Sequence, residues 1–398
     1  MNENSALEQA NQPIVVNNGL EGVIVSSTEI SDVNGVRGEL VYAGYMMEEI
    51  IERQCSYEDV LYLFLRKELP SEKASKDFAK NLASRRKLSS ELEAMIDAIP
   101  KNLDYMDAFR TGVSALGCEI NTSYPPTEEQ ALSLIAKVPI ILSRYFRLKT
   151  KQEVLQQNPN FSHVANYLYL LTGRLPDTLS GQAYAKALDT YFVTTIEHGM
   201  NASTFTARVA ASTQSDLISS IAAAISTLKG PLHGGAPSEI IHMLDAIGTQ
   251  ENAEPWIRNV LEQGGRLMGF GHRVYKSYDP RAKALQKVVE ALPHDDGNEY
   301  LALCRHVEKV AIQLLNEYKP GRNLYPNVEF GAAAVLRAVG LPAELYPATF
   351  GVARCGGWAA HIIEQSHNNR LIRPSCVYTG KWPQTILDRK KLEMSEVS

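Results

Sequence analysis

The segment PTEEQALSLIAKVPIILSRYF, residues 126–146, decides the fold class of this chain. Its apolar residues recur three and four positions apart over more than three turns, which is the period of an amphipathic helix. Thr127 is followed three residues later by Gln130, the capping-box pattern that marks a helix N-terminus. The segment SDLISSIAAAISTL, residues 215–228, has the same period. We therefore expect long helices in both segments.

The same start signal occurs elsewhere in the chain, where Ser or Thr precedes an acidic residue by three positions. The helices that it predicts begin at Ser56, Thr150 and Thr213. One segment differs, because residues 22–45 hold β-rich runs on both sides of Asn34-Gly35, a dipeptide typical of hairpin turns. No alternation of strands and helices follows it. The sequence therefore predicts an all-α fold with a small N-terminal β-hairpin.

Two clusters of glycine and proline divide the chain, at residues 228–237 and 338–347. Such clusters mark loops rather than helices or strands. They predict a small helical domain of residues 235–340, inserted into a large helical domain formed by residues 1–234 and 341–398.

Composition excludes several classes of function. The 398 residues carry a formal net charge of −5, which argues against general binding to nucleic acid or to an anionic membrane. No apolar run approaches the roughly 20 residues that span a bilayer, and the first residues lack a positive region followed by an apolar one. The five cysteines are scattered and form no CxxC pair, so no disulfide framework is indicated. A cytoplasmic protein is expected.

His233 lies in KGPLHGGAP, between Pro231 and the pair Gly234-Gly235, just before a predicted helix. The positive end of a helix dipole disfavours the imidazolium form. A neutral imidazole can donate a hydrogen bond to a carbonyl oxygen that gains negative charge. A histidine that only caps the helix fits the same pattern, and both interpretations stay open.

The stretch GFGHRVYKSYDPR, residues 269–281, combines a bare glycine loop with basic residues. It lacks the third glycine of a dinucleotide fingerprint, and no strand precedes it. A loop of this kind, followed by Arg273 and Lys276, suits a flat base with a phosphate over it. Arg281, fixed after a proline, can present its guanidinium to a carboxylate. A solvated basic turn is the alternative.

Two helical pairs raise the question of a metal. Glu239 and His242 have ExxH spacing, and His361 and Glu364 have the reversed order. No further carboxylate pattern joins the two pairs. We therefore expect core or interface histidines and no metal site.

The remaining candidates are scattered along the chain. His198 stands just before a predicted helix start at Asn201, where capping and ligand contact are both open. Glu329 begins an apolar helix, either as a favourable first-turn charge or as a general base. Arginines beside the glycine-flanked histidines suggest a small polyanionic substrate. These arginines are Arg322, Arg354 and Arg373.

Together, several stretches resemble the signature segments of citrate synthases, in order over roughly residues 19–385. The stretches are GPLHGGA (230–236), GFGHRVYKSYDPR (269–281), EHGMNASTFTAR (197–208) and RCGGWAAHIIEQ with LIRPSCVYTG (354–365 and 371–380). The resemblance implies an intertwined, mainly helical homodimer with the active site in a cleft between two domains. It also implies condensation of acetyl-CoA with oxaloacetate, hydrolysis of citryl-CoA, and no metal or other cofactor.

The resemblance also implies roles for individual residues. The catalytic set would be His233 at the thioester oxygen, Glu329 as base, and His272 at the oxaloacetate ketone. The substrate carboxylates would be held by His198, Arg281, Arg354 and, from the other subunit, Arg373. The CoA-binding set would be Arg266, Leu267, Met268, Gly269, Phe270, Gly271, Lys276 and Arg322.

The chain departs from the family pattern at three positions. Glu329 stands where most members carry Asp, Ala43 where arginine is common, and Glu197 in place of the usual Asp. The longer side chain of Glu329 moves the carboxylate by one methylene, and a misplacement of about 1 Å can cost on the order of 100-fold in rate.

Several alternatives therefore stay open. A 2-methylcitrate synthase would use propionyl-CoA, and one extra methylene discriminates by only ~1–3 kcal/mol. A member weakened at Glu329 and Ala43 would bind its ligands without turnover. A di-metal helical enzyme is the most distant alternative. Assemblies larger than a dimer are also open.

Overall fold

The computed structural model describes residues 16–380, except Gly235, residues 272–274, Lys276, residues 293–297 and Asn323. The chain forms two units, Thr28–Leu371 and a smaller one made of Met1–Ser27 and Ile372–Ser398. In the described part of the smaller unit, the only regular element is the 3-10 helix η1 (Asn18–Leu20).

The larger unit begins with a small antiparallel sheet in the order β1 (Ser31–Asn34), β2 (Glu39–Tyr42), β3 (Tyr45–Met46). The predicted hairpin is confirmed, since Ser31 pairs with Tyr42 and Asn34 with Glu39. Its turn is longer than a two-residue Asn-Gly turn. The Asn34 side chain accepts a hydrogen bond from the Arg37 amide, and Gly38 closes the loop with φ +69°. The third strand was not predicted.

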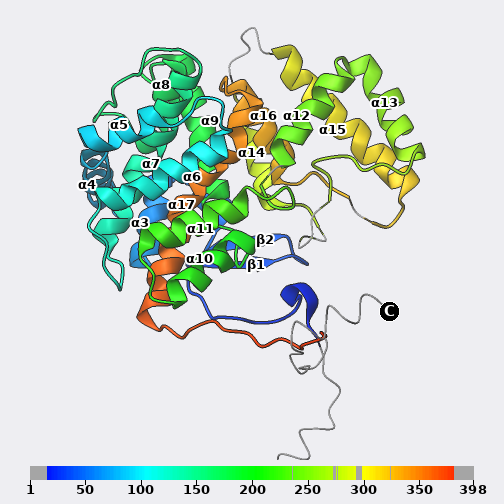
Figure 1. Cartoon of the computed structure of the whole chain (residues 1–398). Coiled ribbons are helices and arrows are strands. Elements are labelled where there is room, and N and C mark those ends of the chain that lie inside the picture. The colour runs from blue at the N-terminus through cyan, green and yellow to red at the C-terminus, as the bar shows by residue number, and fades with distance from the viewer. Residues whose placement is uncertain are drawn as a thin grey trace, which may run out of the picture. The chain divides into compact units, whose positions relative to one another are not determined.

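The rest of the larger unit is helical, which confirms the all-α class (Figure 1). The α-helices are α2 (Met47–Glu52), α3 (Tyr57–Arg66), α4 (Glu72–Ser84), α5 (Ser90–Ala98), α6 (Tyr105–Ala115), α7 (Glu128–Lys149), α8 (His163–Thr172), α9 (Leu179–Thr195), α10 (Ala202–Ser212), α11 (Leu217–Leu228), α12 (Ala236–Ile247), α13 (Gln250–Glu262), α14 (Pro280–Glu290), α15 (Asn298–Tyr318), α16 (Val328–Ala338) and α17 (Tyr346–His367). Two 3-10 helices are η2 (Leu116–Cys118) and η3 (Ala343–Leu345). None of the described helices is long and apolar enough to cross a membrane.

Two of the predicted helix starts are confirmed and two are wrong. Ser56 and Thr127 each form a complete capping box, at the starts of α3 and α7. Thr150 instead ends α7, where its hydroxyl donates to the Phe146 carbonyl at 2.8 Å. Thr213 ends α10, and Asp216 itself caps α11 by accepting from the Ser219 amide. A threonine hydroxyl can bond to carbonyls at a helix end as well as to amides at a helix start.

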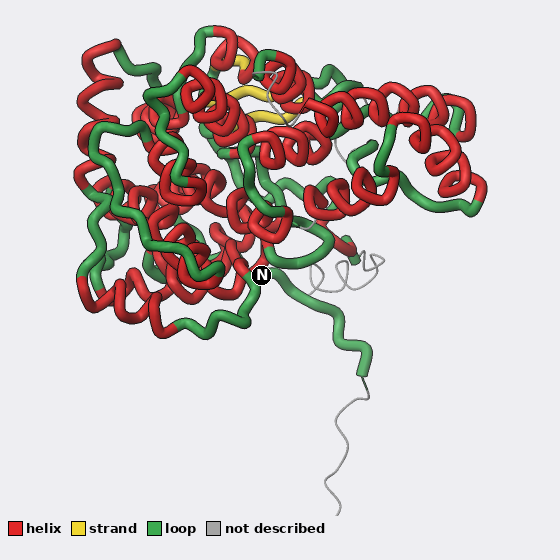
Figure 2. The backbone as a smooth tube through the Cα atoms, turned by 90° about the horizontal axis from the view of Figure 1, so that it is seen from above, coloured by secondary structure: helices red, strands yellow, loops and turns green. Residues whose placement is uncertain are grey.

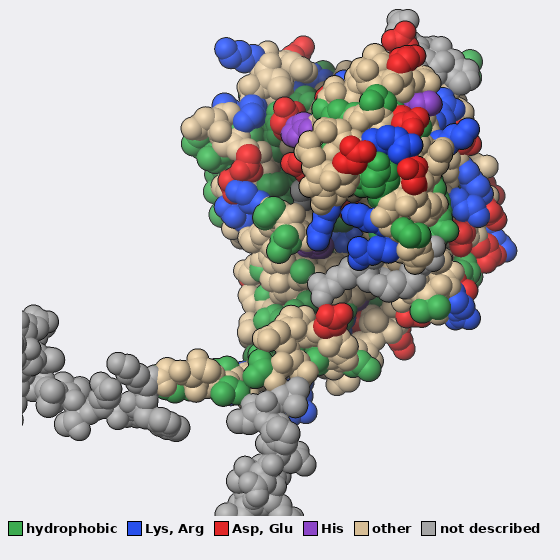
Figure 3. Space-filling view, turned by 90° about the vertical axis from the view of Figure 1, so that its right-hand side faces the viewer, with side chains coloured by type: hydrophobic (Ala, Val, Ile, Leu, Met, Phe, Trp, Pro, Cys, Tyr) green, Lys and Arg blue, Asp and Glu red, His purple; other side chains and the backbone are tan. Residues whose placement is uncertain are grey.

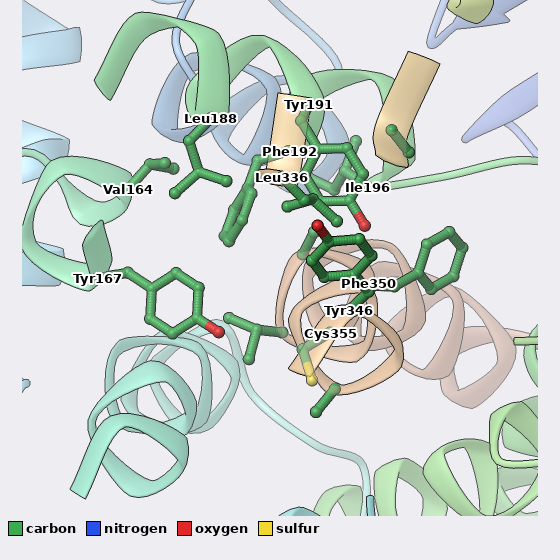
Figure 4. Packing of buried hydrophobic residues seen from close by; sticks show 14 of the residues in the cluster. Val164, Tyr167, Leu188, Tyr191, Phe192, Ile196, Leu336, Tyr346, Phe350 and Cys355 are labelled. Atoms are coloured by element: carbon green, nitrogen blue, oxygen red, sulfur yellow. The ribbon is translucent and has the colours of Figure 1, made fainter. Parts of the chain in front are cut away.

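The helix α17 lies at the centre of the core and packs against α3, α6, α7, α9, α10, α11 and α12. Its Trp358 is fully buried. Figure 4 shows aromatic side chains of α9, including Tyr191 and Phe192, beside Tyr346 and Phe350 of α17. This core holds the polar side chains of α17 in fixed positions.

The helices after residue 235 pack mainly on one another, α13 on α15 and α14 on α16, but α14 and α16 also contact α9. Of the three strands, yellow in Figure 2, β2 and β3 contact α2, and β2 also contacts α3. The division into a large domain and an inserted domain of residues 235–340 stays a prediction.

Candidate active site

Four predicted site residues lie at the ends of helices or on the central helix. His198 follows α9, Arg281 is the second residue of α14, Glu329 is the second residue of α16, and Arg354 lies in α17. The charges of Arg281 and Arg354 both act on the Glu329 carboxyl group. Figure 3 shows a hollow on one face of the molecule in which Lys and Arg side chains gather.

Arg281 is buried and forms a two-pronged ion pair with Asp279, at 3.0 Å from Nε and 2.9 Å from a terminal nitrogen. Asp279 also caps α14 and accepts from the Val328 amide at 3.0 Å, so it ties the starts of α14 and α16 together. Burial alone would lower the pKa of Arg281, but Asp279 raises it overall. Arg281 therefore stays charged in a dry environment.

Arg354 is 2% exposed and has no carboxylate ion pair among the described residues. Its Nε donates to the Thr195 carbonyl, and its guanidinium carbon lies 4.5 Å from the centre of the Phe350 ring. Burial and then the charge of Arg281 lower its pKa, against the opposing pull of Glu197. A buried guanidinium without a carboxylate partner is costly unless an anionic ligand completes it.

Glu329 has a pKa raised to about 7, because burial disfavours its charged form more than Arg281 and Arg354 favour it. Its backbone amide donates to Asn327 Oδ1 at 3.0 Å, which fixes the first turn of α16. A carboxylate with a pKa near neutrality is a stronger base than an ordinary glutamate and is still ionised in a useful fraction.

His233 lies in the turn before α12, with Nε2 at 2.8 Å from Ser203 Oγ. Burial and then the charge of Arg354 lower its pKa to about 4, so the imidazole is neutral at pH 7. Ser203 Oγ also accepts from Trp358 Nε1 and lies 2.8 Å from Asn201 Oδ1. The predicted neutral imidazole is thus consistent with the electrostatics of the turn.

His198 Nε2 lies 3.1 Å from the hydroxyl of Tyr275, and the Tyr275 ring centre lies 5.8 Å from the Arg281 guanidinium. The helix start predicted at Asn201 is confirmed, because Asn201 itself caps α10. Tyr275 therefore lies close to both His198 and Arg281, and Asn201 rather than His198 caps α10.

The glycine loop of residues 266–271 is held against the start of α16. Asn327 donates from its backbone to the Gly269 carbonyl and from Nδ2 to the Gly271 carbonyl, both at 2.9 Å. Gly269 and Gly271 have φ values of +82° and +81°, and a Cβ on Gly269 would lie 2.8 Å from Ile240. Asn327 therefore connects this loop to Glu329, two residues further on.

The remaining predicted residues lie outside the described residues, are exposed, or belong to the glycine loop. His272, Arg273 and Lys276 lie outside the described residues. Arg266 and Arg322 are exposed, and Arg373 is exposed in the smaller unit. Leu267 is buried, while Met268 and Phe270 are partly buried against the core.

The ExxH pair Glu239–His242 and the reversed pair His361–Glu364 have different surroundings in the described structure. Glu239 and His242 are exposed, with 4.0 Å between the closest atoms. Within the described part of the chain, no cluster of three or more His, Cys, Asp or Glu residues could hold a metal ion. His361 instead lies 3.1 Å from the buried Glu197, and Arg208 bonds to both His361 and Glu364.

Comparison with known proteins decides the family. The family model described as "Citrate synthase, C-terminal domain" matches residues 19–375. This chain belongs to the citrate synthase family. Citrate synthase 2 of Bacillus subtilis is 38% identical over 368 residues, covering 91% of this chain and 95% of the relative. The 2-methylcitrate synthase 2 of Corynebacterium glutamicum is 35% identical over 373 residues, covering 92% and 95%.

A solved citrate synthase of the archaeon Thermoplasma acidophilum, in ternary complex with carboxymethyl coenzyme A and oxaloacetate, has the same fold. Its TM-score is 0.84 at 30% identity, covering 95% of this chain and 99% of that chain. The resemblance inferred from the motifs is thus confirmed, and the chain is an acyltransferase of the citrate synthase type.

Three residues of the candidate site were assigned no role from sequence, although each lies in a segment typical of citrate synthases or near one. Asp279 is the first residue of Asp-Pro-Arg, and an aspartate just before a proline that begins a helix is a signal for an N-cap. Asn327 precedes a first-turn acid and also signals an N-cap. Ser203 carries no such signal, because its bond to His233 joins the start of α10 to a turn 30 residues further along the chain.

The departure from the family pattern at Glu197 also has a structural setting in this chain. Glu197 is fully buried and accepts a hydrogen bond from Ser31 of β1 at 3.0 Å. Burial alone would raise its pKa, but His361 and then Arg354 lower it overall. The residue beside His198 thus fixes the strand β1 and the helix α17 to the end of α9.

Proposed function

We propose that this chain condenses acetyl-CoA with oxaloacetate and hydrolyses citryl-CoA to citrate and CoA. The proposal rests on the buried Glu329 carboxyl group, whose pKa is raised to about 7 and which feels the charges of two buried arginines. An acetyl thioester C–H is a very weak acid. Its removal needs a base near neutral pKa and a hydrogen-bond donor at the forming enolate oxygen.

Glu329 is the proposed base, and neutral His233 is the proposed donor at the enolate oxygen. Since Nε2 of His233 is engaged by Ser203, the donor atom would be Nδ1. Nδ1 carries a proton only if Ser203 donates its own proton to Nε2 rather than to Asn201. This tautomer therefore requires the Ser203 proton to turn from Asn201 Oδ1, to which it is donated here, to Nε2 of His233.

Ser203→Ala is expected to lower kcat by roughly 10- to 100-fold, because no hydroxyl remains to orient His233 or to donate to its Nε2. The KM for acetyl-CoA should change little. The variant also leaves the Trp358 indole N–H without its acceptor, which should lower the unfolding free energy by about 1–3 kcal/mol. Steady-state kinetics and urea denaturation measure the two effects. Thr206→Ala on the same helix is the control, and equal loss in both variants would contradict this role for Ser203.

The buried arginines suit oxaloacetate, a dianion, better than lysines would. Arg354, with no carboxylate partner among the described residues, is the proposed primary contact, and Arg281 with His198 the second. His272 would polarise the ketone, and Arg373 would come from the other subunit of a homodimer. The dimer and a cytoplasmic location are part of the proposal, and sedimentation velocity of the purified chain tests the dimer.

The loop 266–271 is proposed to receive the adenine of CoA, with Lys276 and Arg322 facing its phosphates. Asn327 would then align the CoA loop with the base, since it holds Gly269, Gly271 and Glu329 at once.

Asn327→Ser is expected to keep the cap of α16 but lose the bond to Gly271, because serine caps well and has no amide to donate. Its melting temperature should stay near that of the wild type, while the KM for acetyl-CoA rises several-fold. Asn327→Ala should show the same rise and lose about 1 kcal/mol of unfolding free energy besides. An unchanged KM in both variants would remove Asn327 from CoA alignment.

Thiol release from acetyl-CoA, with and without oxaloacetate, tests the proposed function directly. Oxaloacetate-dependent release that favours acetyl-CoA over propionyl-CoA is the expected result. The second candidate, 2-methylcitrate synthesis, is favoured by the identity to the Corynebacterium glutamicum enzyme of that name. A higher kcat/KM on propionyl-CoA would select it. A folded protein that binds oxaloacetate but releases no thiol would be a binder, and the proposal would fail.

A further inference from the structure

A pocket of about 630 Å³ opens on the side of α7, away from the candidate active site. It is lined by the C-terminal half of α7, by the turn before α5 with its first residues, and by the loop of residues 154–157. None of the site residues discussed above lines it. Pockets of a few hundred cubic ångströms are the size that small-molecule ligands occupy.

Two buried guanidinium groups lie in the wall of this pocket. Arg86 and Arg147 are 1% and 7% exposed. Arg86 donates to the carbonyls of Asn158 and Phe161, both at 2.9 Å. Arg147 donates to carbonyls of Leu170, Leu171 and Glu153. Neither arginine forms an ion pair with any residue that the structure describes. Their hydrogen bonds among the described residues therefore all go to backbone carbonyls.

The ionisation of both groups fits this description. Burial lowers the pKa of Arg86 to about 10, with only partial compensation from Glu58, and burial also lowers the pKa of Arg147. Both remain charged at pH 7. An anion in the pocket would raise both pKa values again, because a nearby negative charge favours the ionised form of arginine.

The rest of the lining adds to the positive charge. Lys87 is exposed at the rim. Arg144 is already neutralised by a two-pronged pair with Asp97 at 2.6 and 2.7 Å. Glu93 is the one acidic residue in the lining, and it lies 3.4 Å from Arg144. Three cations without an ion pair among the described residues thus line the pocket, and low-dielectric walls focus their field into it.

The lining also has unsatisfied polar atoms and an apolar wall. Arg86 Nε, Ser143 Oγ and Gln157 Oε1 are buried without a hydrogen-bond partner among the described residues. Such orphaned atoms are rare in native proteins and call for a ligand or ordered water. The apolar wall consists of Leu88, Ile140, Val154, Leu155 and Leu170. An occupant that suits both would carry an anionic group and an apolar part.

A structural role accounts for only part of this arrangement. Arg147 satisfies the last-turn carbonyls of α8, and Arg86 fixes the loop that leads into α8. Neutral donors could make the same contacts without burying charge. That role does not explain why two buried arginines without an ion pair among the described residues stand beside an open pocket.

From these observations we propose that the pocket on α7 is a second binding site, for a small organic anion with an apolar part, either a carboxylate or a phosphate. The anionic group would lie near Arg86, Arg147 and Lys87, and the apolar part against Leu88 and Leu155. The site does not depend on the proposed reaction, so it can be tested whether or not the chain makes citrate.

Binding of phenyl phosphate and phenylacetate to the full chain, measured by calorimetry at constant ionic strength, tests the site. Each probe has a ring and one anionic group, and benzyl alcohol is the neutral match. We expect saturable binding of at least one anion below about 1 mM and none of benzyl alcohol. Comparison of the two anions distinguishes a phosphate site from a carboxylate site.

Matched variants locate the binding. Lys87→Glu should weaken it by at least about tenfold, since attraction becomes repulsion, and Leu155→Trp, which fills the pocket, should abolish it. Lys80→Glu, an equal charge change on α4, and Arg354→Gln, in the candidate active site, should leave it unchanged. The proposal fails if neither anion binds saturably. It also fails if Arg354→Gln removes the binding, or if neither Lys87→Glu nor Leu155→Trp affects it.

Discussion

Glu329→Gln is expected to lower kcat by about 1000-fold while leaving acetyl-CoA binding nearly unchanged, because general-base catalysis is worth roughly 100- to 10,000-fold. The amide keeps the shape of the side chain and cannot accept the methyl proton. Single-turnover rates and the KM for acetyl-CoA measure the two quantities. Glu329→Asp is the companion variant, and recovery of much of the rate would show that the carboxylate, rather than its exact reach, is required.

The same variant is expected to be more stable than the wild type at pH 8. The folded pKa of Glu329 is raised from 4.5 to about 7, so the fold favours the protonated form. Stability from protonation is fully present below pH 4.5 and is lost as pH rises through about 7. Glutamine avoids that loss, so the variant should gain at most about 3 kcal/mol of unfolding free energy over the wild type. Any solvent that reaches the carboxyl group makes this gain smaller. The gain should therefore grow between these two pH values and stay level above them.

Urea denaturation of the wild type and Glu329→Gln at pH 5 and pH 8 checks this sign. A difference in unfolding free energy that is larger at pH 8 supports a desolvated base. An equal or smaller difference at pH 8 would mean that Glu329 is an ordinary first-turn charge, and the base would then have to be sought elsewhere. Kinetics and stability thus test the same carboxylate by independent routes.

The fold class and the helix starts show how far local sequence reaches. Thr127 and Thr150 both precede an acid or amide by three residues, yet one begins α7 and the other ends it. The apolar period after Thr127 is what separates the two cases, and it is absent after Thr150. A capping pattern predicts a helix only together with the periodicity that buries one of its faces.

The site shows a different limit. His233, Arg281, Glu329 and Arg354 are recognisable because their segments resemble citrate synthases. Their electrostatics are not readable from sequence, because the raised pKa of Glu329 follows from burial by elements far apart in the chain. The contact of Asn327 with Gly271 likewise joins residues 56 positions apart. The chemical type of a site residue can be read from its own segment, whereas its desolvation and its alignment with other residues depend on how distant segments pack.

Arg354 carries the second large expected effect. Arg354→Gln should lower kcat/KM for oxaloacetate by about 100- to 1000-fold, since losing one partner of a buried charge pair costs roughly 2–5 kcal/mol. Most of the loss should appear as a higher KM for oxaloacetate, with the KM for acetyl-CoA little changed. Arg354→Lys should recover only part of it, because an ammonium group cannot form the two parallel bonds of a guanidinium.

Steady-state kinetics with each substrate varied in turn measures the effect, and Arg258→Gln on α13 is the control for losing an arginine elsewhere. Circular dichroism confirms that the helices persist, which matters because the Nε of Arg354 also holds the Thr195 carbonyl. A folded Arg354→Gln variant with the wild-type KM for oxaloacetate would contradict the assignment. The guanidinium, 2% exposed and without a carboxylate partner among the described residues, would then need another ligand to account for its burial.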